Sequence, residues 1–247
     1  MSQIKTIVMK FGGTSVADES ARKLMVGHII REVEAGFKAL VVVSAMGRLG
    51  SAYATDTLSA LVSNKISPRE SDRLLSCGEV ISSIVTSDLV RAHGLSVTSL
   101  APVELGILTD TNHTDAHILI VDTRDLLDKF AIHDVLIAPG FIAVSEEGFI
   151  TTLGRGGSDT SAIALGASMG AEFVDIYSDV IGVMTEDPKL NPDAQLITEM
   201  SYDELIELAE AGAKVIHLKA IKLAKDCEVS LRFRSTFEDF VGTVVKK

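Results

Sequence analysis

The chain has 247 residues and is acidic, because 23 lysines and arginines face 34 aspartates and glutamates, giving a formal net charge of −11. This balance argues against nucleic acid or an anionic membrane as the main partner. No apolar run approaches the ~20 residues that span a bilayer, and the N-terminus becomes polar too early for a signal peptide. Cys77 and Cys227 lack metal-ligand spacing, which predicts reduced thiols in a cytoplasmic protein.

The first elements predict a parallel α/β sheet. Residues 4–9 and 40–43 are short apolar runs typical of buried strands, and residues 18–35 have a helical apolar pattern that stops at Gly36. This order predicts a right-handed βαβ unit. Because a glycine-containing turn follows each strand, we expect the two turns to lie near each other.

The middle of the chain predicts a loop at 49–56, a helix near 57–62 and a helix at 71–91 that is interrupted at 76–79. Gly78 inside that helix costs roughly 1 kcal/mol, so it requires a reason. Glu79 has two interpretations: a solvated surface residue or, if it faces a cleft, a partner for the ammonium of an amino acid. His113 and His117 lie in a polar cluster and are interpreted as hydrogen-bonding loop residues rather than metal ligands.

The remaining pattern continues the alternation of strands and helices. Strands are predicted at 97–100, 106–108, 135–141 and 173–177, and helices at 122–130 and 201–211. Residues 229–235 alternate, which predicts a strand with one wet face that carries Arg232 and Arg234. No repeat or extended linker divides the chain.

Residues 151–161, TTLGRGGSDTS, predict a loop that opens directly into a helix. A helix start directs unpaired N–H groups to one point and favours an anion there, and Arg155 and Ser158 add donors. Asp159 fits beside a phosphate only if a lysine or a divalent cation lies between them. Lys10, at the end of the first strand, is well placed to meet a phosphate. The alternatives are an ordinary glycine turn and a surface lysine.

Seven segments together resemble aspartate kinase, closest to the bacterial monofunctional type of the lysine pathway. They occur in the same order over nearly the whole chain: KFGGTS at 10–15, VVSAMGR at 42–48, YATDT at 53–57, SCGE at 76–79, TLGRGGSDTSA at 152–162, SDVIGVMTEDPK at 178–189 and GAKVIH at 212–217. One such motif is common in α/β proteins, whereas the ordered set is highly specific.

The resemblance implies the amino-acid kinase fold, a three-layer αβα sandwich on a mostly parallel sheet, formed by residues 1–247 as one catalytic domain. Residues 1–150 would form the amino-acid-binding lobe and residues 151–247 the nucleotide-binding lobe. The implied reaction is phosphorylation of the L-aspartate side chain by ATP with Mg²⁺ to 4-phospho-L-aspartate, the first step of lysine, threonine and methionine biosynthesis. A homodimer in the cytoplasm is also implied. The alternatives are a related kinase of another amino acid or carboxylate, and a non-catalytic nucleotide-binding paralogue.

The resemblance also implies roles for individual residues. Lys10 and Asp159 would be catalytic, Lys10 on the transferring phosphoryl group and Asp159 ordering Lys10 and the metal region, and no residue is assigned as a direct metal ligand. The substrate would contact Thr55, Glu79, Arg155, Gly156, Gly157 and Ser158, with Glu79 on its ammonium and Arg155 on its α-carboxylate. ATP would contact Lys10, Phe11, Gly12, Gly13, Ser44, Ser178, Asp179, Met184, Lys189 and Lys214.

Three departures from the family pattern change what we expect. Relatives continue into two ACT-type modules that bind lysine or threonine, and this sequence stops at Lys247, so we expect activity that neither amino acid inhibits. Leu218 replaces a common proline and Met184 a common aromatic residue, which weakens the case for adenine stacking. Gly50 lies near the position of a substrate-binding threonine, so Thr55 or Thr57 would serve instead.

Overall fold

The computed structural model describes residues 4–186, 191, 193–213 and 215–246. Within this part of the chain, eight strands form one sheet in the order β10-β12-β11-β9-β1-β2-β6-β3. All neighbouring strands run parallel except β11 and β12. The strands are β1 (Thr6–Phe11), β2 (Lys38–Val43), β3 (Val97–Ser99), β6 (Val135–Pro139), β9 (Val174–Ser178), β10 (Glu199–Ser201), β11 (Leu231–Ser235) and β12 (Val241–Lys246).

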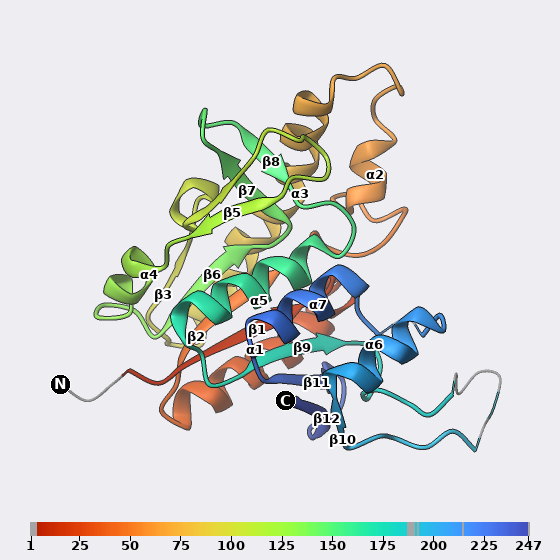
Figure 1. The fold of residues 1–247 in the computed structure, drawn as a ribbon. Coiled ribbons are helices and arrows are strands. Elements are labelled where there is room, and N and C mark those ends of the chain that lie inside the picture. The colour runs from red at the N-terminus through yellow and green to blue at the C-terminus, as the bar shows by residue number, and fades with distance from the viewer. Residues whose placement is uncertain (1–3, 187–190, 192, 214, 247) are drawn as a thin grey trace.

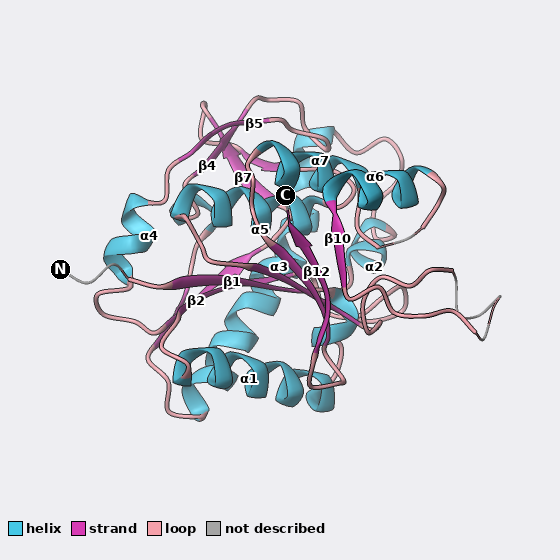
Figure 2. Cartoon of the chain, turned by 60° about the horizontal axis from the view of Figure 1, so that its bottom comes forward, coloured by secondary structure: helices cyan, strands magenta, loops and turns pink. Residues whose placement is uncertain are grey.

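Helices cover both faces of this sheet, which gives the three-layer αβα sandwich that the family resemblance implied (Figures 1 and 2). One face carries α1 (Glu19–Glu34) and α3 (Pro68–Ala92), and the other carries α5 (Gly157–Met169), α6 (Tyr202–Glu210) and α7 (Leu218–Asp226). The central strand β1 shows why both faces are apolar: Ile7 and Met9 pack into one hydrophobic cluster and Val8 into the other. A strand buried on both sides is typical of parallel sheets.

A smaller sheet, which the sequence did not predict, lies beyond the large one (Figure 1). Its order is β5 (Ile118–Val121), β4 (Ile107–Thr109), β7 (Ile142–Ser145) and β8 (Ile150–Thr152). The expectation of a loop at 151–152 was therefore wrong, because these two threonines pair with β7 in an antiparallel ladder. Shorter elements complete the described fold: α2 (Thr55–Ser59), α4 (Arg124–Lys129), and the 3₁₀ turns η1 (Gly13–Val16) and η2 (Pro102–Glu104).

Helix α3 is continuous through residues 76–79, so the predicted interruption was wrong. Gly78 has a packing reason: a Cβ there would lie 2.7 Å from the carbonyl oxygen of Tyr53 and 2.9 Å from the Cβ of Ala45. The glycine therefore lets the loop that precedes α2 lie directly against the helix. Glycine lowers the helix propensity of α3 at this position. The contact that it allows compensates for this, because it brings together two segments of the candidate site described below.

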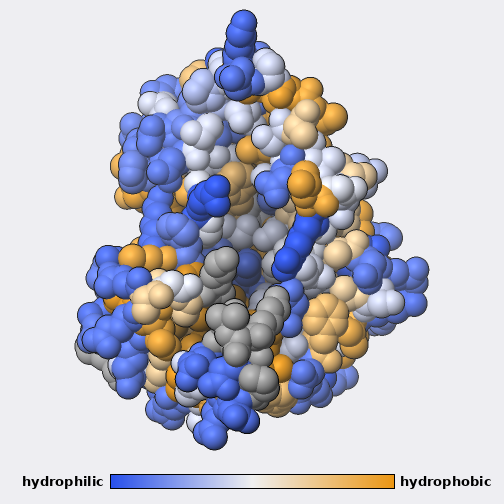
Figure 3. Space-filling model, turned by 90° about the vertical axis from the view of Figure 1, so that its right-hand side faces the viewer, coloured by the Kyte–Doolittle hydropathy of each residue, from blue (hydrophilic) through white to orange (hydrophobic). Residues whose placement is uncertain are grey.

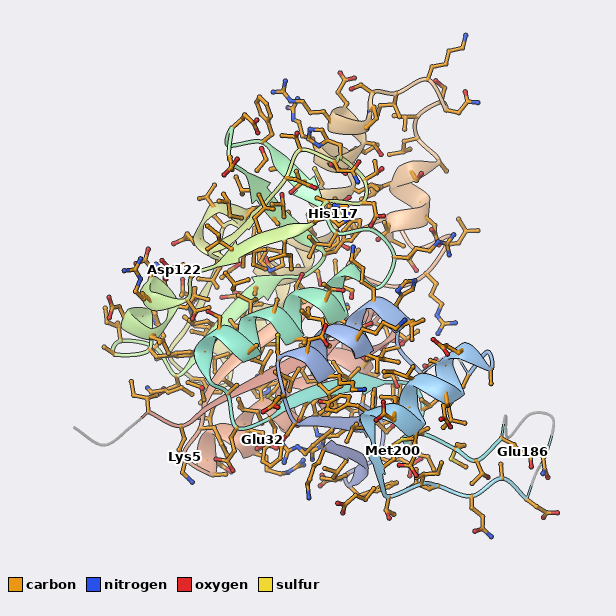
Figure 4. All side chains as sticks on the ribbon, in the orientation of Figure 1. Lys5, Glu32, His117, Asp122, Glu186 and Met200 are labelled. Atoms are coloured by element: carbon orange, nitrogen blue, oxygen red, sulfur yellow. The ribbon has the colours of Figure 1, made fainter. Side chains whose placement is uncertain are left out.

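The expected wet face of β11 was also wrong. Arg232 Nε lies 2.6 Å from Asp175 Oδ1 on β9, and Arg234 Nη1 lies 2.8 Å from Glu32 Oε1 on α1. Glu32 is labelled on α1, below the sheet, in Figure 4. Arg234 is only 6% exposed because α1 covers this face, and the acidic partners make burial of the charge possible.

No helix in the described part of the chain combines the length and apolar character that crossing a bilayer would require.

Candidate functional site at the carboxyl ends of the central strands

A cavity of about 260 Å³ lies where β1, β2 and β6 end and α5 begins. Seen from the right-hand side of Figure 1, the surface is hollowed between its upper and lower halves, with hydrophilic side chains beside the hollow (Figure 3). The cavity is lined by Lys10, Ser44, Thr55, Glu79, Phe141, Gly154, Gly156, Gly157, Ser158 and Asp159. This position agrees with the rule that open α/β sheets bind ligands outside the carboxyl ends of their strands.

Lys10 and Asp159 form an ion pair at the edge of this cavity. Lys10 Nζ lies 2.7 Å from Asp159 Oδ1, and both side chains are 12% exposed. Lys10 comes from the end of β1 and Asp159 from the first turn of α5, where the helix dipole favours a negative charge. The pairing confirms that the two distant glycine-containing segments converge in space, and it removes the objection to a carboxylate at an anion site.

Two glycine turns are packed together beside the pair. Gly47 N donates to the carbonyl of Gly13 over 2.9 Å, and a Cβ on Gly13 would lie 2.5 Å from the carbonyl oxygen of Gly47. The expected proximity of the turns after β1 and β2 is therefore confirmed. A Cβ on Gly12 would lie 3.6 Å from Lys10 Nζ, so the absence of a side chain leaves the space beside the ammonium open.

The third glycine segment turns sharply into α5. Gly156 has a φ of 72°, in the left-handed region, and a Cβ on it would lie 2.4 Å from the Cβ of His217. The helix begins at Gly157, so the first amides of α5 lie at the cavity. Ser158 is held in place because its Oγ accepts a hydrogen bond from Ser44 Oγ over 3.0 Å. The arrangement is suited to hold an anion.

Glu79 supplies negative charge at the same cavity. Its side chain is 2% exposed, and Oε1 accepts hydrogen bonds from Ala45 N over 3.2 Å and from Thr55 Oγ1 over 3.5 Å. Within the described residues, Oε2 is buried without a hydrogen-bond partner. Burial raises the pKa of Glu79 to about 7, although the hydrogen bonds to Oε1 oppose the shift. The interpretation as a solvated surface residue was wrong, and the free oxygen is suited to receive a cationic group.

Helix α2 carries both candidate threonines, and their contacts distinguish them. Thr55 lines the cavity, whereas Thr57 Oγ1 accepts a hydrogen bond from Gly50 N over 3.0 Å. Thr55 is thus the threonine at the cavity.

Other residues predicted for the site lie around it rather than in its wall. Arg155 is exposed and sits between Gly154 and Gly156, which both line the cavity. The Phe11 side chain is fully buried and stacked on Tyr177, with ring centroids 4.4 Å apart, so only the Phe11 backbone can approach a ligand. The sequence could not show whether the Phe11 side chain lies in the core or at the ligand, because Phe11 both ends a core strand and precedes a glycine turn.

The segment after β9 borders the Gly12 turn. Gly12 N donates to the carbonyl of Tyr177 over 3.4 Å, and Ser178 Oγ accepts from Val180 N over 3.3 Å. Asp179 forms an exposed ion pair with Arg48, with 2.9 Å between Asp179 Oδ2 and Arg48 Nη2. Met184 is half-buried and bridges to Leu196. Lys189 and Lys214, also predicted for the nucleotide, lie outside the described residues.

Sequence reasoning missed Phe141 and Gly154 as cavity-lining residues. Phe141 has a φ of 66°, which a bulky residue rarely adopts, so its type gave no signal for this turn. The dipeptide Pro139-Gly140 before it was the available signal. A Cβ on Gly140 would lie 2.9 Å from the Cβ of Ser158, so β6 closely approaches the start of α5.

Both histidines make side-chain hydrogen bonds, as the sequence predicted. His113 Nδ1 lies 2.6 Å from Asp72 Oδ2, and His117 Nδ1 lies 2.8 Å from Asp110 Oδ2. Among the residues that the structure describes, no group of three or more His, Cys, Asp or Glu side chains could hold a metal ion. His117 is labelled in the upper part of Figure 4, in the loop directly before β5, the edge strand of the small sheet.

Fold and cavity together define an α/β protein that can hold an anion and a cationic group side by side at the ends of parallel strands. The chain belongs to the amino acid kinase family, whose model matches residues 5–235. Aspartokinase 1 of Bacillus subtilis (strain 168) is 46% identical over 245 residues, which cover 98% of this chain and 61% of that protein. The chain spans about three fifths of the length of the curated aspartokinases it matches.

Solved structures of aspartate kinases are also similar to this chain. Aspartate kinase from Synechocystis is 38% identical with a TM-score of 0.85, and the match covers 98% of this chain and 39% of that chain. Aspartokinase III of E. coli in complex with aspartate and ADP is 26% identical with a TM-score of 0.84, covering 98% of this chain and 65% of that chain.

Proposed function

We propose that this chain transfers the γ-phosphoryl group of ATP to the side-chain carboxylate of L-aspartate. An oxygen of that carboxylate attacks the γ-phosphorus, the bond from the γ-phosphorus to the β–γ bridging oxygen breaks, and ADP leaves with the electron pair. The products are 4-phospho-L-aspartate and ADP. One observation carries the proposal: the Lys10–Asp159 pair and Glu79, whose Oε2 has no hydrogen-bond partner among the described residues, line one cavity. The E. coli relative described above, which was solved with aspartate and ADP, supports both substrates.

The proposed chemistry needs position and charge neutralisation more than covalent catalysis. Lys10 would neutralise charge on the transferring phosphoryl group, and Asp159 would hold the ammonium of Lys10 toward the cavity. The amides of Gly13 and of the first turn of α5 would donate to phosphate oxygens. Every one of these groups lies on a strand end or a helix start, so little rearrangement is required of them.

The amino acid would lie between Glu79 and the glycine segment before α5. Glu79 would accept the α-ammonium through its free oxygen, and Arg155, exposed beside Gly156, would turn toward the α-carboxylate. Thr55, Gly156, Gly157 and Ser158 complete the substrate contacts that we propose. The side-chain carboxylate would then face Lys10.

The nucleotide would extend from Lys10 along the turn after β9. We propose contacts with Ser44, with the Phe11 backbone, with Ser178, Asp179 and Met184, and with Lys189 and Lys214. Residues 1–150 would thus form mainly the amino-acid lobe and residues 151–247 mainly the nucleotide lobe.

The donor set fits a Mg²⁺ ion that arrives with ATP rather than one held by the protein alone. The described residues offer isolated carboxylates near the phosphate turn, Asp159 and Asp179, and no closed ligand cage. Mg²⁺ commonly takes one or two carboxylates and completes its shell with phosphates and water. When bound, it neutralises charge on the phosphates.

The test is a coupled assay for ADP release with aspartate, glutamate and N-acetylglutamate as separate acceptors. We expect turnover with aspartate that depends on both ATP and Mg²⁺. Turnover with another acceptor and none with aspartate would make this chain a related kinase of the same fold. Binding of ATP without turnover of any acceptor would favour the non-catalytic paralogue.

We also infer that two copies associate and that the protein works in the cytoplasm. The curated relatives are aspartokinases, and Cys77 and Cys227 are free, which suits a reducing compartment. Sedimentation equilibrium at micromolar concentration tests the dimer, and a single species with the monomer mass of 26.3 kDa would contradict it.

A further inference from the structure

A second buried carboxylate on α3 has no role in the proposed reaction. Asp72 is fully buried and accepts hydrogen bonds from three donors. Thr152 Oγ1 donates to Oδ1 over 2.6 Å, and His113 Nδ1 lies 2.6 Å from Oδ2. The amide of Thr114 lies 3.1 and 3.2 Å from the two oxygens. Because a carboxylate only accepts, His113 carries its proton on Nδ1.

These bonds hold a backbone conformation that the sequence disfavours. Thr114 has a φ of 73°, and a β-branched residue in the left-handed region is an outlier. Such a conformation persists only where the surroundings fix it, and strained positions cluster at functional sites. Asp72 fixes this one by accepting the Thr114 amide with both carboxylate oxygens.

The loop that Asp72 holds lies against the glycine segment of the cavity. A Cβ on Gly154 would lie 2.4 Å from Asp115 Oδ1, so the Asp115 side chain packs directly against Gly154. Ala116 N donates to the carbonyl of Thr152 over 2.9 Å, and Lys219 Nζ on α7 lies 3.2 Å from Asp115 Oδ1. Gly154 is therefore enclosed by a loop whose shape depends on Asp72.

Asp72 and Glu79 are seven residues apart on α3, so their side chains leave the same face of the helix about two turns apart. Glu79 accepts hydrogen bonds from the amide of Ala45 and the hydroxyl of Thr55. Asp72 accepts hydrogen bonds from Thr152 on β8 and from the loop at 112–115. One rigid helix thus sets the distance between the two ends of the cavity wall.

We propose that Asp72, together with His113 and Thr152, is a positioning residue that fixes residues 154–158 relative to Glu79 and thereby sets the affinity for the amino acid. The inference rests on the proposed function for the identity of that amino acid. The positioning role itself is independent of the proposed function, because hydrogen bonds and close packing connect Asp72 to the cavity wall.

Neighbouring threonines on β8 provide a matched pair of variants. Thr151 and Thr152 are 0% and 1% exposed, and each makes one short side-chain hydrogen bond. Thr152 bonds to Asp72, whereas Thr151 Oγ1 lies 2.7 Å from Thr109 Oγ1 inside the small sheet. Thr152→Val and Thr151→Val make the same chemical change on opposite sides of one strand. Only the first disturbs Asp72.

We expect Thr152→Val to raise KM for aspartate by about 10- to 100-fold, because small displacements of positioning groups have effects of this size. KM for ATP should stay within about twofold, and Thr151→Val should leave both constants within that range. Asp72→Asn, which keeps the size of the side chain but removes its charge, should resemble Thr152→Val. KM for aspartate within twofold of wild type in both Thr152→Val and Asp72→Asn would overturn the proposal.

Amide hydrogen exchange without ligand separates this inference from the proposed function. Exchange at residues 154–158 should become faster in Thr152→Val and Asp72→Asn and stay unchanged in Thr151→Val. If the wild type turns over no aspartate, the proposed function fails and the exchange result alone decides the role of Asp72. If Thr152→Val does not fold, His113→Gln, at a partly exposed position, replaces it, and unchanged exchange at 154–158 in that variant overturns the proposal.

Discussion

At the scale of single residues, the site is defined by charges that are buried with incomplete compensation. Lys10 and Asp159 neutralise each other at the cavity edge, whereas Glu79 keeps one oxygen unpaired. A buried carboxylate of this kind is costly in the free protein and becomes favourable once a cation pairs with it. This cost supports the proposed role of Glu79 as the partner of a cationic group.

Replacing Lys10 by Met should lower kcat by at least ~10²-fold while ATP binding stays measurable, because the variant lacks the charge that meets the transferring phosphoryl group. The variant also leaves Asp159 without its cation, so Lys10→Met/Asp159→Asn should recover stability but not activity. Steady-state kinetics and urea unfolding measure both effects. Lys38→Met is the control, because Lys38 pairs with Asp134 over 2.9 Å at the opposite end of the neighbouring strand. An unchanged kcat in Lys10→Met would contradict the role of Lys10.

The raised pKa of Glu79 predicts opposite pH effects on stability and on substrate binding. Because burial raises this pKa from 4.5 to about 7, the folded protein binds a proton that the unfolded chain has lost between those values. Stability should therefore fall as pH rises from about 4.5 to 7. Glu79→Gln should be more stable than wild type at pH 8 and similar to it at pH 4, as measured by urea unfolding.

Binding of the substrate ammonium should instead improve with pH, because it requires ionised Glu79. We expect kcat/KM for aspartate to rise up to about tenfold per pH unit below pH 7 and to level off above it. In Glu79→Gln the value should be low and nearly independent of pH across that range. A wild-type profile that is flat from pH 5.5 to 7 would sink the role of Glu79 as the ammonium partner.

At the scale of elements, the sequence predicted those parts whose local pattern and tertiary environment agree. The strand near 4–9, the helix at 18–35 and the start of α5 after its glycines were all expected, because apolar period, capping and glycine placement coincide there. The convergence of Lys10 with Asp159 was implied by the family resemblance, and the rule for strand ends and the charge conflict at Asp159 agreed with it.

The parts that were missed depend on contacts between distant segments. Apart from β4, which the sequence predicted at 106–108, the strands of the small sheet were missed. They have three or four residues, too few for a periodic signal, and β8 is partly polar because its threonines bond to Asp72 and Thr109. The two arginines of β11 alternate with apolar residues, as in a strand with one solvent-facing side. Both are nevertheless largely buried, in ion pairs with Asp175 and Glu32. Gly78 suggested a break in α3 because local propensity carries no information about the loop that packs on it.

Gly78→Ala tests this reading of α3. Alanine favours helix by about 1 kcal/mol, but its Cβ would meet the Tyr53 carbonyl, and such overpacking costs about 1–3 kcal/mol. We expect net destabilisation and a higher KM for aspartate, because the displaced loop leads directly into Thr55 at the start of α2. Gly27→Ala in α1 is the matched control, since an added Cβ there meets nothing within 4 Å and should stabilise. Equal stabilisation by both substitutions, measured by thermal unfolding, would contradict the packing reason for Gly78.

At the scale of the whole molecule, a buried ionic cluster connects the layer of α1 to the sheet strands beyond β1. Asp175 on β9 pairs with both Arg232 and Arg234 on β11, and Arg234 also pairs with Glu32 on α1. Burial raises the pKa of Asp175, and Arg232 opposes that shift. Since β9 also carries the turn that borders Gly12, the cluster anchors the strand that ends at the proposed nucleotide contacts.

Asp175→Asn should therefore destabilise the whole fold by about 3–5 kcal/mol, because it leaves two buried guanidinium groups short of a counter-charge. Asp122→Asn provides the comparison, since its pair with Arg124 is exposed to solvent and its loss should change stability far less. Kinetics measured well below the melting temperature should give KM for ATP near the wild-type value in both variants, because Asp175 lies inside β9, away from the cavity lining. A loss of ATP affinity in Asp175→Asn without a loss of stability would instead mean that the cluster acts on the nucleotide turn directly, rather than through the rigidity of the sheet.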